Sequence, residues 1–333
     1  MRDDERPGDC TADIIVGTHA LIQEKVKFRK LGLVVIDEQH KFGVMQRGLL
    51  RKKGINPDVM VMTATPIPRS LALTLYGDLD CSVIDELPPG RKQVDTRWVE
   101  SECKEEIFAV LKQEISRGRQ AYVVYPAIEE SESSGLKSAV QGKEAFERKF
   151  PEYRIGLLHG RMKSGDREQV MDRFKKSEID ILVCTTVIEV GVDVPNATVM
   201  LIVHAERFGL SQLHQLRGRV GRGAERSFCI LIAYQPGEDA RRRLDIMVQT
   251  NDGFRIAEED LGIRGPGEFL GTRQAGLPDL KNADLRKDSA MLGTARQEAF
   301  GLIQQDGELL KFPFLKQQLD VFWKGKADLF KTG

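Results

Sequence analysis

Short apolar runs rich in β-branched residues recur along the chain and alternate with longer polar stretches. The runs are Asp13–Val16, Leu33–Ile36, Val59–Met62, Ala121–Tyr125, Ile155–Leu158, Ile181–Val183, Val199–Val203 and Phe228–Ala233. They lack the polar alternation of a half-exposed strand, so they predict strands that are buried on both faces, as in a parallel sheet. Because helical patterns lie between them, the sequence predicts the α/β fold class.

The alternation is interrupted at Glu86–Lys92, where paired prolines and a glycine cannot continue regular structure. This break predicts a linker between two α/β units. Beyond Gln235–Gly237 the strand pattern stops, and mostly helical segments follow. Within the second unit we expect helices at Lys104–Arg117, ended by Gly118, and at Asp166–Lys176, with Ser164 or Asp166 as the cap, and a polar loop at Glu129–Ser138.

Composition excludes several classes of protein. The 333 residues carry 50 Lys and Arg against 50 Asp and Glu, which argues against a simple polycationic nucleic-acid binder. No apolar run approaches the roughly 18 residues of a membrane span, and the charged N-terminus is unlike a signal peptide. The 5 cysteines are scattered without a C-x-x-C pair, which is typical of a protein of the reducing cytoplasm.

Polar residues that can bind ligands or take part in catalysis follow the predicted strands. Asp37 and Glu38 come directly after Leu33–Ile36, and such a pair can hold Mg²⁺ through one carboxylate while the other polarises a water. Considered alone, the pair is also compatible with a solvated turn. Because ligands of open α/β sheets bind at the carboxyl ends of the strands, we expect the chemistry there.

Two further segments follow strands. Thr63–Arg69 places hydroxyl groups at a strand end, where they can relay a change at a phosphate site; a proline-rich turn is the alternative. Cys184–Pro195 combines small hydroxyls with Gly191, whose backbone a phosphate can approach closely. In the same segment Asp193 can accept hydrogen bonds from a ribose, and the alternative is a plain loop that ends at a proline.

The segment Gln212–Gly223 is the most specific signal. It interleaves Arg217, Arg219 and Arg222 with glycines, a spacing that a solvated run of charge does not need. Arg219 and Arg222 can place guanidinium groups on the charge that develops at a γ-phosphate, as arginine fingers do.

These four elements, in this order, resemble the later motifs of superfamily-two helicases and translocases. Asp37–His40, Thr63–Arg69 and Leu157–Met162 narrow the resemblance to the RecG family, bacterial ATP-dependent DNA helicases that remodel stalled forks and junctions. Ile256–Gly276 resembles the translocation element that this family shares with the transcription-repair coupling factors. Gln39 and the Gly-Pro-Gly-Glu sequence at Gly265–Glu268 favour RecG over the coupling factors.

The resemblance implies RecA-like parallel-sheet lobes: the C-terminal half of a first lobe over 1–88, a complete second lobe over 97–235, and a helical hairpin, translocation motif and C-terminal segment over 236–333. It also implies ATP and Mg²⁺ as cofactors and a monomeric cytoplasmic motor. The implied partner is DNA, as forks, junctions and duplex, and no membrane is involved.

The resemblance also assigns roles to residues. Asp37 coordinates Mg²⁺, Glu38 activates the attacking water, and Arg219 and Arg222 act as arginine fingers. Residues implied to contact the nucleotide are Gln39, His40, Gly191, Asp193 and Gln215. Residues implied to bind DNA or couple to its movement are Thr18, His19, Thr63, Thr65, Thr185, Thr186, Arg264, Thr272, Arg273 and Gln274.

A phosphate-binding loop, G-x-x-x-x-G-K-[ST], belongs before the Asp-Glu pair in this family, and the sequence contains none. We therefore expect the C-terminal portion of a longer protein, without the wedge domain, that hydrolyses ATP negligibly on its own. We also expect a poorly ordered N-terminal region and a second lobe that folds over Arg97–Ala233. The alternatives are a noncatalytic DNA-binding remnant, a transcription-repair coupling translocase and, less favoured, an RNA helicase, because only the resemblance selects DNA over RNA.

Overall fold

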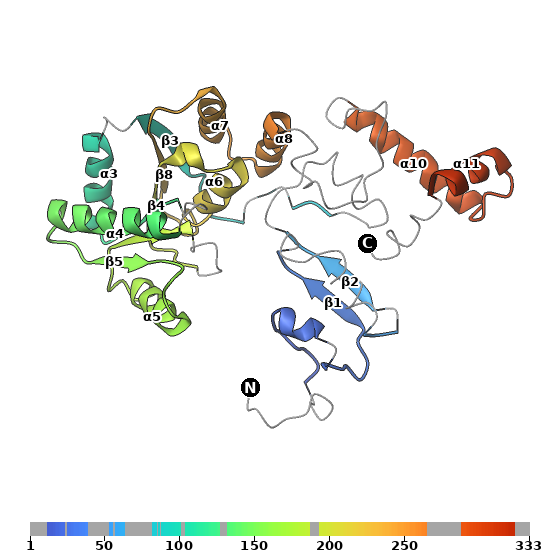
Figure 1. Ribbon diagram of the computed structural model, residues 1–333, viewed down its shortest axis with the longest axis horizontal. Coiled ribbons are helices and arrows are strands. Elements are labelled where there is room, and N and C mark those ends of the chain that lie inside the picture. Colours follow the sequence, from blue (N-terminus) through green and yellow to red (C-terminus); the bar gives the residue numbers. More distant parts are fainter. Residues whose placement is uncertain are drawn as a thin grey trace. The chain divides into compact units, whose positions relative to one another are not determined.

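The computed structural model describes residues 12–23, 25–38, 53–55, 57–63, 82–84, 86, 88–100, 104–126, 132–186, 193–264 and 288–323. The chain divides into two compact units. The second unit contains the elements from β3 to α8, and the first contains the elements that precede and follow them (Figure 1).

The second unit is built on a six-stranded parallel sheet with the strand order β3-β8-β7-β4-β6-β5. Its strands are β3 (Asp95–Glu100), β4 (Gln120–Tyr125), β5 (Ile155–Leu158), β6 (Ile181–Thr185), β7 (Ala197–Val203) and β8 (Phe228–Ala233). The central strand β4 lies between β6 and β7, so the chain turns first to one side of β4 and then to the other.

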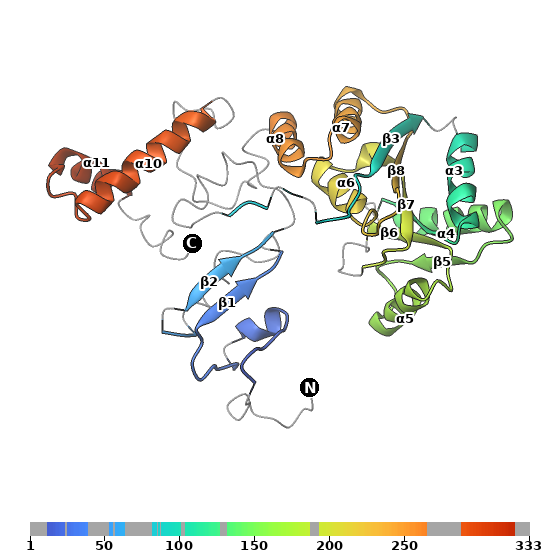
Figure 2. The same ribbon diagram turned by 180° about the vertical axis from the view of Figure 1, so that it is seen from behind.

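Helices cover both faces of this sheet (Figure 2). One face packs against α3 (Lys104–Ser116) and α4 (Glu132–Lys149) through side chains such as Leu111 and Phe146. The other packs against α5 (Ser164–Lys175), α6 (Leu210–Arg217), α7 (Glu238–Gln249) and α8 (Gly253–Arg264). Because both faces are covered, the central strands can be apolar along their whole length, and every residue of β6 and β7 is buried.

The first unit contains a two-stranded parallel sheet of β1 (Leu33–Ile36) and β2 (Asp58–Val61), preceded by the short 3-10 helix η1 (His19–Ile22). Val34 and Ile36 are buried, whereas Leu33 and Val35 on the opposite face are more than half exposed. Two helices, α10 (Ser289–Gln305) and α11 (Pro313–Trp323), complete the described elements of this unit.

The α/β fold class predicted from the apolar runs is confirmed, and most runs are strands within two residues of the expected ends. Asp13–Val16 is an exception, because this segment is irregular and exposed. The expectation of burial on both faces is wrong for β1, β2 and β5. Exposure alternates along them because β1 and β2 form a sheet of two described strands and β5 lies at a sheet edge.

Two local expectations are also corrected, and one strand was not predicted. The polar stretch predicted as a loop at Glu129–Ser138 is helical from Glu132, where α4 begins. Helix α5 has Lys163 at its N-cap with no side-chain cap, so neither Ser164 nor Asp166 serves in that role. Strand β3 was not expected, because its sequence Asp-Thr-Arg-Trp-Val-Glu is polar for a strand and it is an edge strand.

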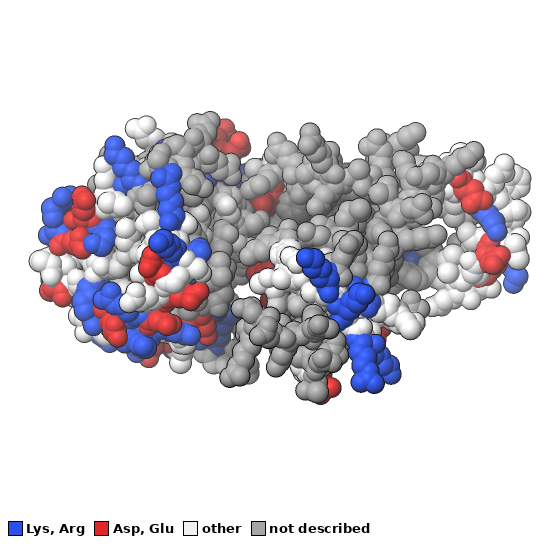
Figure 3. All heavy atoms as spheres, turned by 60° about the horizontal axis from the view of Figure 1, so that its bottom comes forward, with Lys and Arg blue, Asp and Glu red and all other residues white. Residues whose placement is uncertain are grey.

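Among the described residues, no helix is both long enough and apolar enough to cross a membrane. On the face shown in Figure 3, basic and acidic side chains are mixed on the second unit, and several basic side chains lie close together at the centre of the view.

Candidate functional site

The arginine-rich loop follows α6 and depends on two of its glycines. Gly221 has φ +72°, and a Cβ atom there would lie 2.8 Å from Cγ2 of Val94. A Cβ atom at Gly223 would lie 2.8 Å from the carbonyl oxygen of Pro195. The interleaved glycines therefore let this loop pass between the segment that enters β3 and the segment that enters β7.

Arg222 and Asp193, which lie far apart in the sequence, meet beside this loop. Nη1 of Arg222 lies 3.4 Å from Oδ1 of Asp193, and its Nε donates to the carbonyl oxygen of Gly218 at 3.1 Å. The side chains are 30% and 57% exposed, so solvent weakens this ion pair. Most of the donors of Arg222 therefore stay available to an anionic ligand.

Tyr122 is a buried residue of β4 whose ionisation responds to the same charges. Burial, and next the neighbouring Cys184 thiol, raise the pKa of the Tyr122 phenol well above its usual value. Arg219 and Arg222 lower the same pKa and Asp193 raises it, so all three charges act on one phenol. Arg222 and Asp193 are thus in contact, and the charge of Arg219 acts on the same phenol. Tyr122 has no signal of its own in the sequence, because its apolar neighbours are typical of a core strand.

The position of this group differs from the expectation. Asp193 and Arg222 lie in the segments that lead into the amino ends of β7 and β8, not at the carboxyl ends of those strands. The reason is that α6 packs on the face of the sheet and returns the chain to the start of β8, so the arginine loop lies on that face.

Arg217, the first arginine of the motif, is 3% exposed and has a different role. Its Nη1 donates to the carbonyl oxygens of Met247 at 2.8 Å and Thr250 at 2.9 Å, at the C-terminal end of α7. Its Nη2 lies 3.1 Å from Nδ1 of His214. Burial, and secondly Arg217, lower the pKa of His214 to about 4, so this histidine is neutral at pH 7.

A second contact joins α6 to the helical hairpin of α7 and α8. The Ser211 hydroxyl donates to Oδ2 of Asp260 on α8 at 3.1 Å, and Asp260 is 2% exposed. With Arg217, this contact ties the helix that precedes the arginine loop to both helices of the hairpin. No local sequence pattern predicts this connection, because both contacts depend on long-range packing.

Arg91 supports the loop from the other side. Its Nε donates to the carbonyl oxygen of Gly221 at 2.9 Å. That carbonyl shares a planar peptide group with the backbone nitrogen of Arg222, so the bond holds the peptide plane that precedes Arg222.

Asp37 and Glu38 lie in the first unit, at the carboxyl end of β1 as expected. The Asp37 carboxylate is exposed and accepts a hydrogen bond from the Glu38 backbone nitrogen at 2.8 Å. Glu38 has φ +52°, a left-handed conformation that is uncommon outside glycine and concentrates at functional sites.

The residues fit magnesium that arrives with a nucleotide. The described residues contain no group of three or more His, Cys, Asp or Glu side chains able to hold a metal ion. Mg²⁺ commonly binds through one or two carboxylates together with substrate phosphates and waters. The exposed oxygens of Asp37 are sufficient for that mode.

Of the predicted DNA-contacting residues, Thr185 and Thr186 lie at the carboxyl end of β6. In the register of β5 and β6, Leu158 pairs with Cys184, which places His159 beside Thr185. Nδ1 of His159 is buried and makes no hydrogen bond within the described part of the chain. This histidine lies within the Leu157–Met162 motif, which by itself predicts no role for it.

In the first unit, Thr18 and His19 are exposed at the start of η1, and Thr63 is exposed just after β2. Gln215 is half-buried on α6, and Arg264 is the last residue of α8. The remaining predicted site residues lie outside the described residues: Gln39, His40, Thr65, Gly191, Thr272, Arg273 and Gln274.

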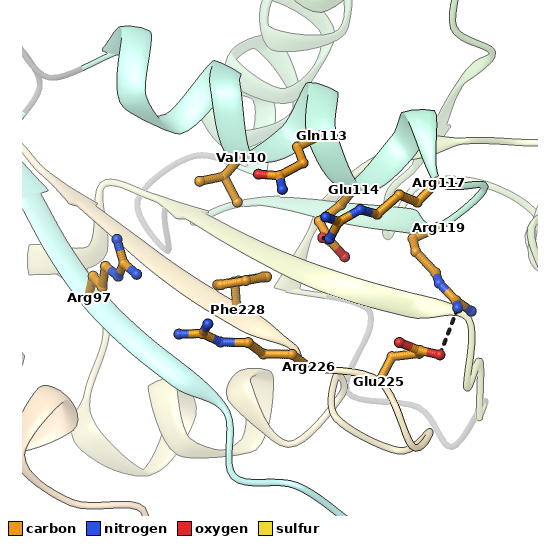
Figure 4. Close-up of a pocket in the computed structure, with 9 residues that line it drawn as sticks. All are labelled: Arg97, Val110, Gln113, Glu114, Arg117, Arg119, Glu225, Arg226 and Phe228. Atoms are coloured by element: carbon orange, nitrogen blue, oxygen red, sulfur yellow. Dashed lines mark hydrogen bonds and ion pairs between the residues drawn. The ribbon is translucent and has the colours of Figure 1, made fainter.

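A cavity of about 620 Å³ lies at the amino ends of β4 and β8, and none of the predicted site residues lines it (Figure 4). Arg97, Arg117, Arg119 and Arg226 line it together with Glu114 and Glu225. Each of these arginines pairs with a carboxylate, of Asp95, Glu114 or Glu225. Ion pairs thus engage every arginine at the border of the cavity, and we assign the cavity no ligand.

Three family descriptions match the chain: "DEAD/DEAH box helicase" over residues 2–74, "Helicase conserved C-terminal domain" over 104–224, and "ATP-dependent DNA helicase RecG, domain 3, C-terminal" over 250–332. The ATP-dependent DNA helicase RecG of Synechocystis sp. is 55% identical over 92% of this chain and 37% of its own length. That of Bacillus subtilis is 52% identical over 91% of this chain and 44% of its own length.

A solved structure of RecG bound to a three-way DNA junction is 50% identical and superposes with a TM-score of 0.65, covering 84% of this chain and 36% of that one. The chain therefore spans less than half the length of the relatives that it matches. By sequence and by fold, it corresponds to the C-terminal part of the RecG family of ATP-dependent DNA helicases.

Proposed function

We propose that this chain supplies the second motor lobe and the coupling segment of a monomeric, ATP-dependent double-stranded DNA translocase that remodels stalled forks and junctions. The observation that carries the proposal is the arginine loop, in which Arg222 pairs with Asp193. The RecG structure bound to a three-way junction supports the choice of DNA.

In this proposal, residues of both units serve ATP hydrolysis. Asp37 holds the Mg²⁺ that accompanies the nucleotide, and Glu38 orients and deprotonates the attacking water. When bound, the magnesium neutralises phosphate charge. Arg219 and Arg222 stabilise the charge that develops on the γ-phosphate, and Asp193 holds Arg222 close to that position. Gln39, His40, Gly191 and Gln215 complete the nucleotide contacts.

A second set of residues binds DNA and transmits movement to it. Thr18, His19, Thr63, Thr65, Thr185 and Thr186 contact the phosphate backbone. His159 lies beside Thr185, and its Nδ1 is buried without a partner among the described residues. In this proposal its ring contacts the same DNA strand as Thr185. Arg264, Thr272, Arg273 and Gln274 belong to the coupling element.

Arg217 and Ser211 support this coupling role, because they tie α6 to the hairpin of α7 and α8. A change at the arginine loop then moves the hairpin that leads toward residues 264–274. Accordingly, we propose a division into residues 1–88 of a first lobe, a second lobe over 97–235, and a coupling and C-terminal region over 236–333.

A chimaera tests the proposal. The chain replaces the matching C-terminal part of the Bacillus subtilis RecG, and ATP hydrolysis is measured with and without three-way junction DNA. We expect junction-stimulated turnover, and we expect Glu38→Gln to reduce it at least about 100-fold because the general base is lost, with nucleotide binding retained. Glu105→Gln, in the first turn of α3, is the matched control and should be neutral.

The outcomes separate the competing functions. Junction binding without turnover in the chimaera would indicate the noncatalytic DNA-binding alternative. Retained turnover in the Glu38→Gln variant would refute the role assigned to Glu38. Stimulation by RNA and not by DNA would overturn the choice of substrate.

A further inference from the structure

The chain is neutral overall, but one segment of the first unit is strongly basic. Lys25, Lys27, Arg29 and Lys30 lie within six consecutive residues that contain no acidic residue. All four side chains are exposed, whereas Val26 and Phe28 between them are half-buried. We name Lys25, Lys27, Arg29 and Lys30 the basic ridge.

Lys53 joins the basic ridge from a distant part of the sequence. Its Nζ donates to the backbone carbonyl oxygens of Gln23 and Val26, the latter at 2.8 Å, and lies 5.9 Å from the centre of the Phe28 ring. These contacts fix the backbone at the start of the basic ridge. The positive charge of Lys53 therefore adds to the field of the four exposed cations, and the segment has a defined anchor.

The ridge differs from the charged surface of the second unit. There, basic side chains such as Arg154, Arg119 and Arg226 form ion pairs with carboxylates. Within the described residues, none of the four ridge cations forms an ion pair with a carboxylate. On the face shown in Figure 3, several basic side chains lie close together at the centre of the view, whereas the two signs are mixed on the second unit.

We propose that the basic ridge is a docking surface for the phosphate backbone of DNA. Exposed, unneutralised Lys and Arg side chains bind phosphates by releasing condensed counterions, a contribution that does not depend on sequence. Alternate residues of a non-helical segment face the same side, and the half-buried Val26 and Phe28 leave Lys25, Lys27 and Arg29 directed to solvent. This inference deepens the proposed function, because it adds a DNA contact outside the motif residues named above.

The test uses the full chain and a fluorescein-labelled three-way junction, with the dissociation constant measured by anisotropy at several salt concentrations. A variant carries K25A, K27A, R29A and K30A. If all four cations contact phosphate, the slope of log affinity against log salt becomes shallower by about 3.6, from about 0.9 for each contact. Affinity at moderate salt should fall at least about tenfold.

The matched control removes the same amount of charge from the second unit, through K112A, K137A, K175A and K176A, which also replace exposed lysines. The control should change the slope of log affinity against log salt by no more than about 0.9, the value of one phosphate contact. A ridge variant that behaves like this control would overturn the docking surface and leave the proposed function standing. Absence of any junction binding by the parent chain at low salt would overturn both.

Discussion

Replacing Arg217 by alanine should destabilise the second unit far more than removal of any exposed arginine. The guanidinium is 3% exposed and makes its shortest contacts with the carbonyl oxygens of Met247 and Thr250, at 2.8 and 2.9 Å. Both acceptors lie at the end of α7, where no further helical turn supplies donors. The substitution therefore leaves helix-terminal carbonyls without their partners.

The magnitude follows from these contacts. Leaving a buried acceptor without its partner costs about 1–3 kcal/mol. Taking about 2 kcal/mol for the buried carbonyl of Met247 and about 1 kcal/mol for the partly buried carbonyl of Thr250 gives a loss of about 3 kcal/mol in the free energy of unfolding. The contact with His214 and the space left by the side chain add to this loss. Relief of the desolvation that lowers the pKa of Arg217 opposes it.

Urea unfolding checks the value. Trp98 on β3 donates to Asp245 on α7 at 2.8 Å, so its fluorescence reports on this unit, and Trp323→Phe removes the second tryptophan of the chain. Arg173→Ala is the matched control, because its ion pair with Glu178 is half exposed and is worth at most about 0.5 kcal/mol. If Arg217→Ala falls within about 0.5 kcal/mol of this control at an unchanged denaturant slope, the structural role of Arg217 is refuted.

Two other substitutions probe the same region. Gly221→Ala should lower the free energy of unfolding by about 1–2 kcal/mol more than Gly90→Ala, as measured by thermal unfolding. Both glycines have positive φ, but only at Gly221 would a Cβ lie 2.8 Å from Val94. Equal losses in the two variants would mean that the close approach to Val94 is easily relieved. The folded pKa of His214 lies near 4, below the usual value near 6.5, so the unfolded chain takes up the proton first and stability is lost as pH falls from about 6.5 toward 4. From pH 7 to pH 5 this loss amounts to at most about 2 kcal/mol, and His214→Gln should flatten that part of the stability curve; an equal slope in both proteins would contradict the assignment.

Many elements of the fold can be predicted from short segments of the sequence. The apolar runs of β4, β6, β7 and β8 predict strands because a segment without polar alternation can be buried only between two covered faces. Strand β3 was missed, because an edge strand can carry Asp95, Arg97 and Glu100 at no cost to the core. The helical start of α4 was also missed, because its first residues are polar serines and glutamates that are typical of loops.

The candidate site divides along a similar line. The sequence by itself determined that arginines, glycines and an Asp-Glu pair occur at spacings typical of a nucleotide-driven motor, because such spacing is a property of short segments. It could not rank the three arginines. Only the tertiary structure decided that Arg217 is buried against α7 whereas Arg222 faces Asp193, because burial depends on which distant segments pack on each side of α6.

The same reason applies to Gly221, Tyr122 and the basic ridge. Their surroundings come from Val94, from the arginine loop and from Lys53, all remote in sequence. A sequence pattern records which residue types are present and how far apart they lie along the chain. Which of them lose water, share a hydrogen bond or keep an unneutralised charge is decided only when segments far apart in the sequence come into contact.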